Sequence, residues 1–478
     1  MNKSITLFVR IIVLVLVVVS CSGEPGLVLR VLDEDTMQVI TITGDKTRPV
    51  SVFEADFVIL GGGLGGIAAA LSICSSGRTV ILIEESDRIA GCFAHGDTST
   101  YTENRFVDTS GSSQTYQMFR KRIVEWYAKR SEEQPLQFSD IFDRIDDFGG
   151  DEFCFGTDAA LDVIDDMLAL NVERGKLTIL KRQKAAHAIM YYDRIHSLRV
   201  IDLDEKICNQ VAGWMYIDAT RTGYLFPLAG IGYAVGKESG TDTGEPHAPA
   251  QADTMFSQKF VYCPKTKLPD DKVGVCVVTD TVNEPSGEGD DALRFSIVSE
   301  PRRMTAFGLL DETDFSADFN DGCRAAFFKD SVGIGYYPMV IDDGNPLTPP
   351  EIVPTKPFQI PLRALVHKGV KNLLAGGGTI GSTYIASTAL RAPATEWAIG
   401  EAAGEVAAHC AGMKVYTHEF INSPDLVRQL QQFLVGKRGI PIYWYDDVAP
   451  GDDDFVEAQL RPFDEPDFDE KQDSLHDH

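Results

Sequence analysis

Residues 56–66 read DFVILGGGLGG, and no other stretch of the chain carries so clear a structural pattern. A short apolar strand over 56–60 runs into glycines with the spacing GxGxxG at Gly61, Gly63 and Gly66. In this pattern the first glycine permits a tight turn, the second lets the backbone approach a diphosphate, and the third lets helix and strand pack closely. The free N–H groups and the dipole of a helix N-terminus favour negative charge. The stretch therefore predicts a diphosphate at the start of a helix.

The residues that follow complete a strand–helix–strand unit. A helix rich in small residues is predicted over 67–75, and a second apolar strand over 79–83. Glu84 ends that strand at the distance expected for a carboxylate that binds the hydroxyl pair of a ribose, and Glu85 is the close competitor. Strand, loop, helix, strand and acid in this order predict a dinucleotide-binding unit.

The residues after the acid distinguish NAD from FAD. Residues 84–91, EESDRIAG, resemble the stretch after the ribose acid in FAD enzymes of the glutathione-reductase structural class, where a glycine pair lies beside the cofactor. Ala90 stands where the first of these glycines is usual, and Gly91 is the second. The wider sequence resembles the bacterial FAD-dependent oxidoreductase family over residues 56–460.

Further blocks before the C-terminal third carry this resemblance. Residues 217–220, IDAT, look like the strand end that normally continues Ala-Thr-Gly near the FAD, although Arg221 stands where the glycine is usual. Residues 236–238 and 243–247 are similar to a segment of the family's cap lobe.

A second glycine loop is predicted at residues 372–379, NLLAGGGT, which resemble the second flavin-contacting loop of the family. Glycines at a strand end let backbone press against a flat or anionic ligand. The helix predicted over 395–411 places a partial positive charge where a reduced flavin is negative. It is matched to the family by Arg391, residues 396–397 and residues 400–404. Residues 376–381 also satisfy GxGxxG, so a second dinucleotide domain is the alternative, although no complete βαβ unit with its own acid follows.

The resemblance implies FAD as the cofactor, and no metal site is predicted. The residues that we expect to bind FAD are Gly61, Gly63, Leu64, Gly65, Gly66, Glu84, Glu85, Gly91, Gly377, Gly378, Thr379 and Arg391.

The catalytic residues are left unassigned. Relatives often have a basic residue where Gly378 stands and a His-Pro pair where residues 393–394 stand. We considered His95, Tyr384 and Arg391 as general bases, and for each a structural role is favoured. Cys92 adjoins Gly91 and would lie near the flavin, or even attach to it, but we favour a buried, inert thiol.

The composition excludes several classes of function. The 478 residues include 71 acidic and 44 basic residues, a formal charge of -27 that repels phosphate backbones, so nucleic-acid binding is not expected. The cysteines form no CxxC pair, which argues against zinc, iron–sulfur and dithiol sites. The sequence contains no GxSxG, HExxH or GxxxxGK[ST] motif.

The N-terminus has the features of a targeting signal. A basic start precedes an apolar run over 11–19, which is too short to span a bilayer as a mature helix. The run ends in residues 18–21, VVSC, which resemble the lipobox of bacterial lipoproteins, in which the cysteine is acylated and becomes the new N-terminus. We therefore expect an exported bacterial protein of the cell envelope, bound to a membrane only through a lipidated Cys21. An ordinary signal peptide is the alternative.

The expected fold class is α/β, with a Rossmann-like FAD-binding lobe that is split in sequence and an inserted β-rich cap lobe. Helical periodicity predicts helices over 118–129 and 158–174, and short strands follow between 177 and 217. Beyond residue 223 helical periodicity is weak and strand candidates such as 273–278 appear. The predicted boundaries are 1–20 for the signal peptide, 21–54 for the anchor and a hairpin, 55–222 and 366–412 for the FAD-binding lobe, 223–365 for the cap lobe, and 413–478 for a C-terminal extension whose acidic tail after Glu457 is mobile at its end.

Three hypotheses for the activity remain open. The resemblance implies an FAD-dependent oxidoreductase, an oxidase or dehydrogenase that takes a hydride equivalent from a small organic substrate. The second hypothesis is a flavin reductase-like enzyme that uses NAD(P)H. The third is an inactive lipid-anchored protein that binds flavin or another ligand. The sequence does not specify the substrate.

Overall fold

The structure is a computed structural model of the chain, and it describes residues 27–33, 36, 38–94, 99–104, 106–130, 142–145, 150–256, 301–342 and 350–465. The predicted signal sequence, Cys21 and His95 lie outside the described residues. Within the described ranges, no helix combines the length and the apolar composition that crossing a membrane requires.

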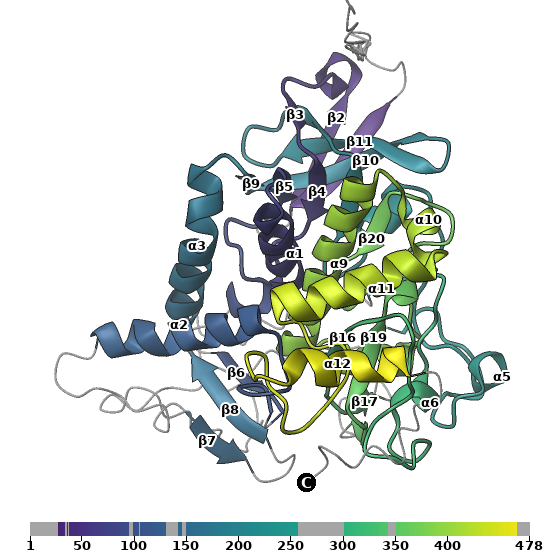
Figure 1. Cartoon of the computed structure of the whole chain (residues 1–478). Coiled ribbons are helices and arrows are strands. Elements are labelled where there is room, and N and C mark those ends of the chain that lie inside the picture. Colours follow the sequence, from purple (N-terminus) through teal and green to yellow (C-terminus); the bar gives the residue numbers. More distant parts are fainter. Residues whose placement is uncertain are drawn as a thin grey trace, which may run out of the picture.

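A five-stranded parallel sheet, in the order β20-β13-β4-β5-β9, lies at the centre of the molecule (Figure 1). Leu60 pairs with Ile83 and Asp218, and Asp218 pairs with Ala375. The carboxyl ends of four strands therefore meet at one edge, where open α/β sheets bind their ligands. The strands are β4 (Phe57–Leu60), β5 (Val80–Ile83), β9 (Leu177–Leu180), β13 (Met215–Asp218) and β20 (Leu373–Ala375).

Two helices pack on this sheet and against each other, α1 (Leu64–Ser75) and α9 (Pro393–Met413) (Figure 1). The predicted strand–helix–strand unit is confirmed, but α1 begins at Leu64 and not at residue 67, because Gly63 is already its N-cap. α9 begins with Pro393, whose fixed φ suits the first helical position. Because β20 and α9 come from late in the chain, the sheet joins segments that are far apart in sequence.

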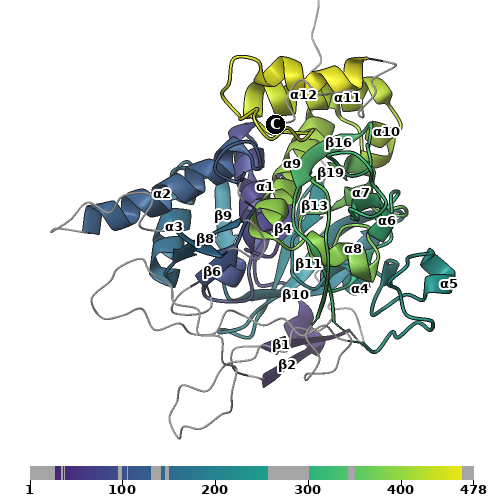
Figure 2. The ribbon, with the colours of Figure 1, turned by 90° about the horizontal axis from the view of Figure 1, so that it is seen from below.

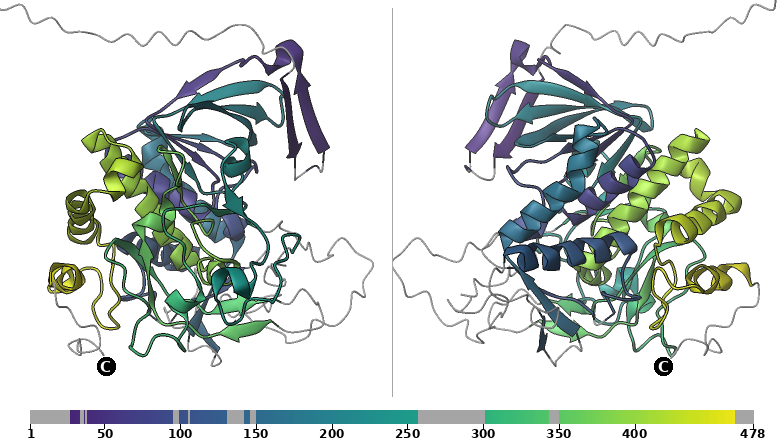
Figure 3. Two further views of the ribbon diagram at one scale, coloured as in Figure 1. Left: turned by 90° about the vertical axis from the view of Figure 1, so that its right-hand side faces the viewer. Right: turned by 60° about the vertical axis from the view of Figure 1, so that its left-hand side comes forward.

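A second, four-stranded sheet in the order β10-β11-β12-β3 supports the N-terminal hairpin of β1 (Val28–Asp33) and β2 (Gln38–Thr43) (Figure 3). The predicted hairpin is confirmed. Its alternating apolar residues Leu29, Val31, Ile40 and Ile42 pack against Ile201, Leu203 and Cys208 in a small separate core. The strands of the sheet are β3 (Val52–Glu54), β10 (Gln183–Tyr191), β11 (Arg194–Asp202) and β12 (Cys208–Ala212).

The two helices that periodicity predicts over 118–129 and 158–174 are confirmed. They are α2 (Gln114–Arg130) and α3 (Thr157–Glu173). Near them lies a three-stranded sheet in the order β6-β8-β7, which the sequence analysis did not predict. Its strands are β6 (Ser99–Thr102), β7 (Phe142–Ile145) and β8 (Gly150–Phe155).

The described part of residues 223–365 consists of short strands in pairs and one-turn helices. The pairs are β14 (Tyr233–Ala234) with β15 (Arg303–Met304), β16 (Ser331–Gly335) with β19 (Phe358–Pro361), and β17 (Met339–Ile341) with β18 (Glu351–Val353). The helices are α4 (Leu225–Leu228), α5 (Gly240–Thr243), α6 (Glu312–Phe315) and α7 (Leu362–Leu365). The predicted strand over 273–278 lies outside the described residues.

The chain after α9 is helical, which the sequence analysis did not predict. It forms α10 (Thr417–Ile421), α11 (Pro424–Phe433), a π-helical turn at Leu434–Arg438 and α12 (Phe455–Asp464). Figure 2 shows α10, α11 and α12 gathered on the side of the molecule where α9 lies. The acidic tail was expected to begin after Glu457, but that residue lies inside α12 and the helix continues to Asp464.

Candidate cofactor site

The first glycine loop has the geometry that its spacing predicts. Gly61 has φ +94°, and a Cβ on it would lie 2.6 Å from the carbonyl oxygen of Ala219. A Cβ on Gly66 would lie 1.9 Å from the carbonyl oxygen of Gly61. Both glycines are therefore required by the fold, one for the turn and one for the contact between α1 and β4.

Gly63 and Gly377 differ from these two glycines, because a Cβ on either would make only ordinary van der Waals contacts. The nearest atom to a Cβ on Gly63 would be Oε1 of Glu396 at 3.4 Å, and for Gly377 it would be the same oxygen at 3.8 Å. The carbonyl oxygen of Ala219 lies 4.0 Å from both positions. The two glycine loops therefore face one point from opposite sides. We call the space between Gly63, Gly377 and the Ala219 carbonyl oxygen the glycine cradle.

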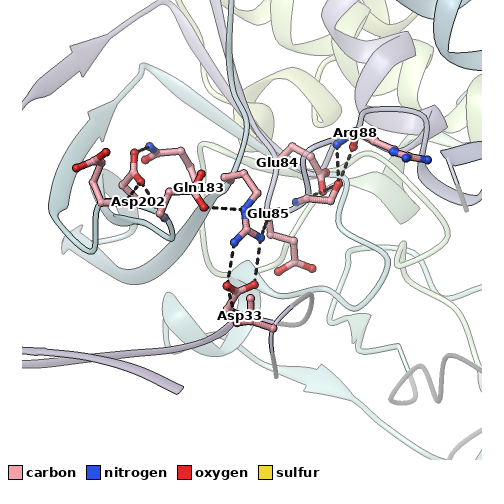
Figure 4. A network of polar contacts seen from close by, with 11 residues as sticks. Asp33, Glu84, Glu85, Arg88, Gln183 and Asp202 are labelled. Atoms are coloured by element: carbon pink, nitrogen blue, oxygen red, sulfur yellow. Dashed lines mark hydrogen bonds and ion pairs between the residues drawn. The ribbon is translucent and has the colours of Figure 1, made fainter. Parts of the chain in front are cut away.

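The two acids after β5 have different environments, and Glu84 faces the glycine loop. Its Oε2 accepts a hydrogen bond from the Gly62 N–H at 2.6 Å, and its Oε1 accepts bonds from the Ser86 N–H at 2.9 Å and the Ser86 hydroxyl at 2.8 Å. Glu85 forms an ion pair with the buried Lys184. Figure 4 shows Glu84 directed toward Arg88 and Glu85 directed the other way, toward Asp33. Of the two candidates, only Glu84 is hydrogen-bonded to the glycine loop in the described residues.

We expected a glycine pair beside the cofactor at residues 90–91, and the structure requires glycine only at the second position. Gly91 begins a 3₁₀ turn over Gly91–Ala94, has φ +56°, and a Cβ on it would lie 2.9 Å from the Cα of Gly63. Ala90 is fully buried, and its φ is not positive. The alanine that replaces the first glycine is therefore compatible with this loop.

The remaining predicted residues gather at the second glycine loop, between β20 and α8 (Tyr384–Ala389). A Cβ on Gly378 would lie 3.3 Å from the Cγ of Arg391, and the Arg391 Nη2 donates to the Ser387 hydroxyl at 3.0 Å. Thr379 is buried, and its carbonyl oxygen accepts the Met304 N–H at 2.9 Å. Gly377, Gly378, Thr379 and Arg391 are thus neighbours in space.

Glu396 belongs to the helix that resembles the one after the family's second flavin-contacting loop, but the sequence predicts no role for it at the site. It lies in the first turn of α9, and its carboxylate faces the Gly65 N–H at the N-terminus of α1. Burial raises the pKa of Glu396, and the charge of Arg221 opposes that shift. Arg221 stands where the resemblance places glycine. Its charge acts on Glu396, which lies in the cradle.

Tyr384, a candidate general base, lies in a cluster beside the second loop. Tyr384 is buried, its ring packs edge-on against Phe256 at 5.4 Å between centroids, and the Lys237 ammonium lies 5.3 Å from its ring centroid. Glu238 accepts the Tyr384 N–H at 2.9 Å and also binds the buried Arg303 at 2.7 Å. These contacts join the segment 236–238 to the second glycine loop.

A small hollow lies at the N-terminus of α9. It is lined by residues that include Asn104, Tyr336, Tyr337, Ala394 and Thr395. Glu103 at its edge is fixed by an ion pair with Arg120 and a hydrogen bond from the Tyr116 hydroxyl. The hollow therefore combines aromatic and polar groups with the positive end of a long helix.

The buried cysteines behave as inert thiols. Burial raises the pKa of Cys74 to about 11 and raises the pKa of Cys208 and Cys410. Cys92 is half-buried beside Gly91 in the 3₁₀ turn.

A parallel sheet, a glycine loop at the N-terminus of α1, an acid after the second strand and a second glycine loop define a dinucleotide-binding α/β protein. The chain belongs to the family described as FAD dependent oxidoreductase, whose model matches residues 56–294 and 298–434. FAD is accordingly its cofactor.

Similar solved structures include the E. coli quinol fumarate reductase FrdA, with 13% identity, 80% of this chain and 75% of that chain covered, and a TM-score of 0.35. THI4 of Thermovibrio ammonificans has 17% identity over 42% of this chain and 76% of that chain, with a TM-score of 0.26. The myxobacterial chondrochloren halogenase CndH has 18% identity over 36% of this chain, with a TM-score of 0.24, and the match spans 38% of its length. Among curated proteins no relative matches the chain.

Proposed function

We propose that the protein oxidises a small organic substrate by taking a hydride equivalent onto FAD, and that oxygen or another acceptor reoxidises the flavin. The observation that carries the proposal is the glycine cradle, where a Cβ on Gly63 or Gly377 would have no atom nearer than 3.4 Å, at the edge where the strands end. We also keep our prediction that the flavin lobe is of the glutathione-reductase structural class.

The residues present fit FAD at its diphosphate, ribose and flavin ends. The first-turn N–H groups of α1, from Leu64 to Gly66, have no partners within their own helix and are suited to the diphosphate. Glu84 would hold the ribose, and Gly377, Gly378 and Thr379 with Arg391 would border the flavin side. Bound flavin supplies the hydride acceptor. Glu396 alone conflicts with a diphosphate when it is ionised, because it lies in the same cradle.

We place the substrate near the N-terminus of α9, next to the small hollow there. Asn104 and the two aromatic residues Tyr336 and Tyr337 would orient an organic molecule, and the helix end would stabilise negative charge that develops on the flavin. The tyrosines belong to the region 223–365, which we predicted to form the substrate side. We assign no general base.

We further propose that the protein is exported and bound to a membrane of the bacterial cell envelope through a lipidated Cys21. The support is the sequence of residues 11–21, an apolar run followed by a lipobox-like VVSC. Mass spectrometry of the purified N-terminal peptide tests this proposal. Acylation of Cys21 is expected, and an unmodified chain that still begins at Met1 would contradict it.

An absorbance spectrum of the purified protein, followed by anaerobic addition of a panel of alcohols, amines, hydroxy acids and amino acids, tests the activity. We expect the flavin band, and its bleaching by a member of the panel. Bleaching by NADH alone would support the reductase hypothesis and contradict direct substrate oxidation. A protein that stays colourless with added FAD would contradict the proposal entirely. The Gly63→Ala variant is the control, because its methyl group enters the cradle with the nearest backbone atom 4.0 Å away.

A further inference from the structure

Glu396 lies where the cofactor's diphosphate is expected. Its Oε1 is the atom nearest to a Cβ built on either Gly63 or Gly377, at 3.4 Å and 3.8 Å, so the carboxylate lies between the two glycine loops. It also faces the Gly65 N–H. Gly65 is in the first turn of α1, and such N–H groups are the ones that bind a diphosphate in this kind of site.

The charges around Glu396 come from few groups. Arg221, in the loop after β13, is the charged side chain whose field acts on it, and α1 contributes the positive end of its dipole. Glu84 is the other carboxylate beside the first glycine loop, and it is already bound to the Gly62 N–H. The second loop contributes uncharged glycines at 376–378, and the charged Arg391 lies beside Gly378.

An ionised Glu396 and a diphosphate are incompatible in this position. Both are anions, both need the same N–H group, and like charges a few ångströms apart in a water-poor site repel strongly. A protonated Glu396 has no such conflict, because its hydroxyl can donate a hydrogen bond to a phosphate oxygen. Burial already favours the neutral form by raising the pKa of Glu396. The side chain is only partly covered, so a bound ligand can contact it.

We propose that Glu396 is a cofactor-binding residue that shares the diphosphate site with FAD, and that FAD binds together with one proton, which Glu396 takes up. This inference rests on the proposed placement of FAD in the glycine cradle. In the cofactor-free protein the Glu396 carboxylate satisfies the Gly65 N–H and keeps the helix end neutralised. In the complex the protonated side chain turns its hydroxyl to the diphosphate.

The proposal fixes the sign of the pH dependence. The diphosphate raises the pKa of Glu396 above its value in the cofactor-free protein, so binding takes up a proton between the two pKa values. The dissociation constant of FAD then increases by up to about tenfold for each pH unit in that interval. At pH values below both pKa values the carboxyl is already neutral and affinity does not change with pH.

The test is calorimetric titration of FAD into flavin-free full-length protein in detergent, from about pH 6 to pH 8.5. Repeating each titration in two buffers of different ionisation enthalpy gives the number of protons taken up. We expect uptake that approaches one proton and weaker binding at high pH. In Glu396→Gln, which has the same shape and no titration, uptake should fall to zero and FAD should bind about tenfold more tightly than to wild type at the highest pH.

Glu401→Gln is the matched control, since Glu401 is a buried carboxyl in the same helix whose Oε1 binds the Thr115 hydroxyl at 2.5 Å and not α1. It should keep the wild-type proton uptake. Affinity and uptake that are independent of pH in wild type, or a pH dependence that persists in Glu396→Gln, would overturn the inference while leaving the proposed function intact. Absence of FAD binding to wild type and both variants at every pH would overturn the proposed function, and this inference with it.

Discussion

The interface between α1 and α9 and the glycine cradle lie side by side, and both are built from glycine. At the interface the glycines meet backbone: a Cβ on Gly400 would lie 2.0 Å from the Gly65 carbonyl oxygen, and one on Gly404 would lie 2.6 Å from that of Ala69. In the cradle, the nearest atom to a Cβ on Gly63 or Gly377 would be a side-chain oxygen, at 3.4 Å or 3.8 Å, and the nearest backbone atom would be 4.0 Å away. Glycine therefore allows two helices to pack closely in one region and allows a ligand to bind in the other. A substitution at the interface should lower stability, whereas a substitution in the cradle should lower cofactor affinity.

The largest effect is expected at the helix interface. Gly400→Ala places a methyl group against the backbone of Gly65, which cannot move without displacing α1 and the sheet. We expect a loss of at least about 3 kcal/mol in the free energy of unfolding, measured by urea denaturation with circular dichroism. Gly412→Ala in the same helix has no atom within 4 Å of its Cβ and should raise stability by up to about 1 kcal/mol. Equal stabilities of the two variants would show that α1 and α9 are not in backbone contact.

The next largest effect, on FAD affinity, distinguishes the two acids that follow β5. Glu84→Gln replaces an acceptor of three hydrogen bonds by an amide whose N–H groups oppose the Gly62 or Ser86 donors. FAD affinity should fall by about 2–3 kcal/mol, or roughly 30- to 150-fold, as flavin fluorescence titration would show. Glu85→Gln keeps a neutral contact to Lys184 and should change affinity less than about twofold. The reverse order would identify Glu85 as the ribose acid.

A smaller effect on the free energy of unfolding is expected from Glu401, a buried carboxyl of α9. Burial raises the pKa of Glu401 to about 7 from an ordinary value of 4.5. The folded state therefore favours protonation, and the stability that this contributes is present below the unfolded pKa and is lost as pH rises through about 7. Between about pH 5 and pH 8, wild type should lose about 2 kcal/mol more unfolding free energy than Glu401→Gln. Parallel pH curves for the two proteins would contradict this.

The smallest effect is expected in the cradle. In Gly63→Ala and Gly377→Ala the nearest backbone atom lies 4.0 Å from the new methyl group, so their unfolding free energies should stay within about 1 kcal/mol of wild type. Each methyl group occupies space that the cofactor needs, and FAD affinity should fall by about tenfold, or about 1.4 kcal/mol. Unchanged affinity in both variants would mean that the cradle is not the cofactor site.

The sequence alone predicts the parts of this fold that local spacing determines. The βαβ unit, the second glycine loop, the N-terminal hairpin and helices α2 and α3 follow from apolar periodicity and glycine placement. The C-terminal helices were missed although Val427, Leu430 and Leu434 recur at helical spacing and are buried, so their signal was available.

Glu396 could not be given a role in this way. It is a single acid in a helix, and a sequence gives no sign that its carboxylate reaches the N-terminus of α1, which comes from the other end of the chain. The choice between Glu84 and Glu85 depends in the same way on side-chain direction, which the spacing leaves open. Long-range contacts of this kind are set by packing of the whole sheet.

A crystal structure of the protein with FAD tests the central claim most directly. The diphosphate should lie between Gly63 and Gly377 within hydrogen-bond distance of the Gly65 N–H, with Glu84 on the adenosine ribose and the flavin ring toward Gly378. FAD bound elsewhere, with the cradle still filled by Glu396, would contradict the account.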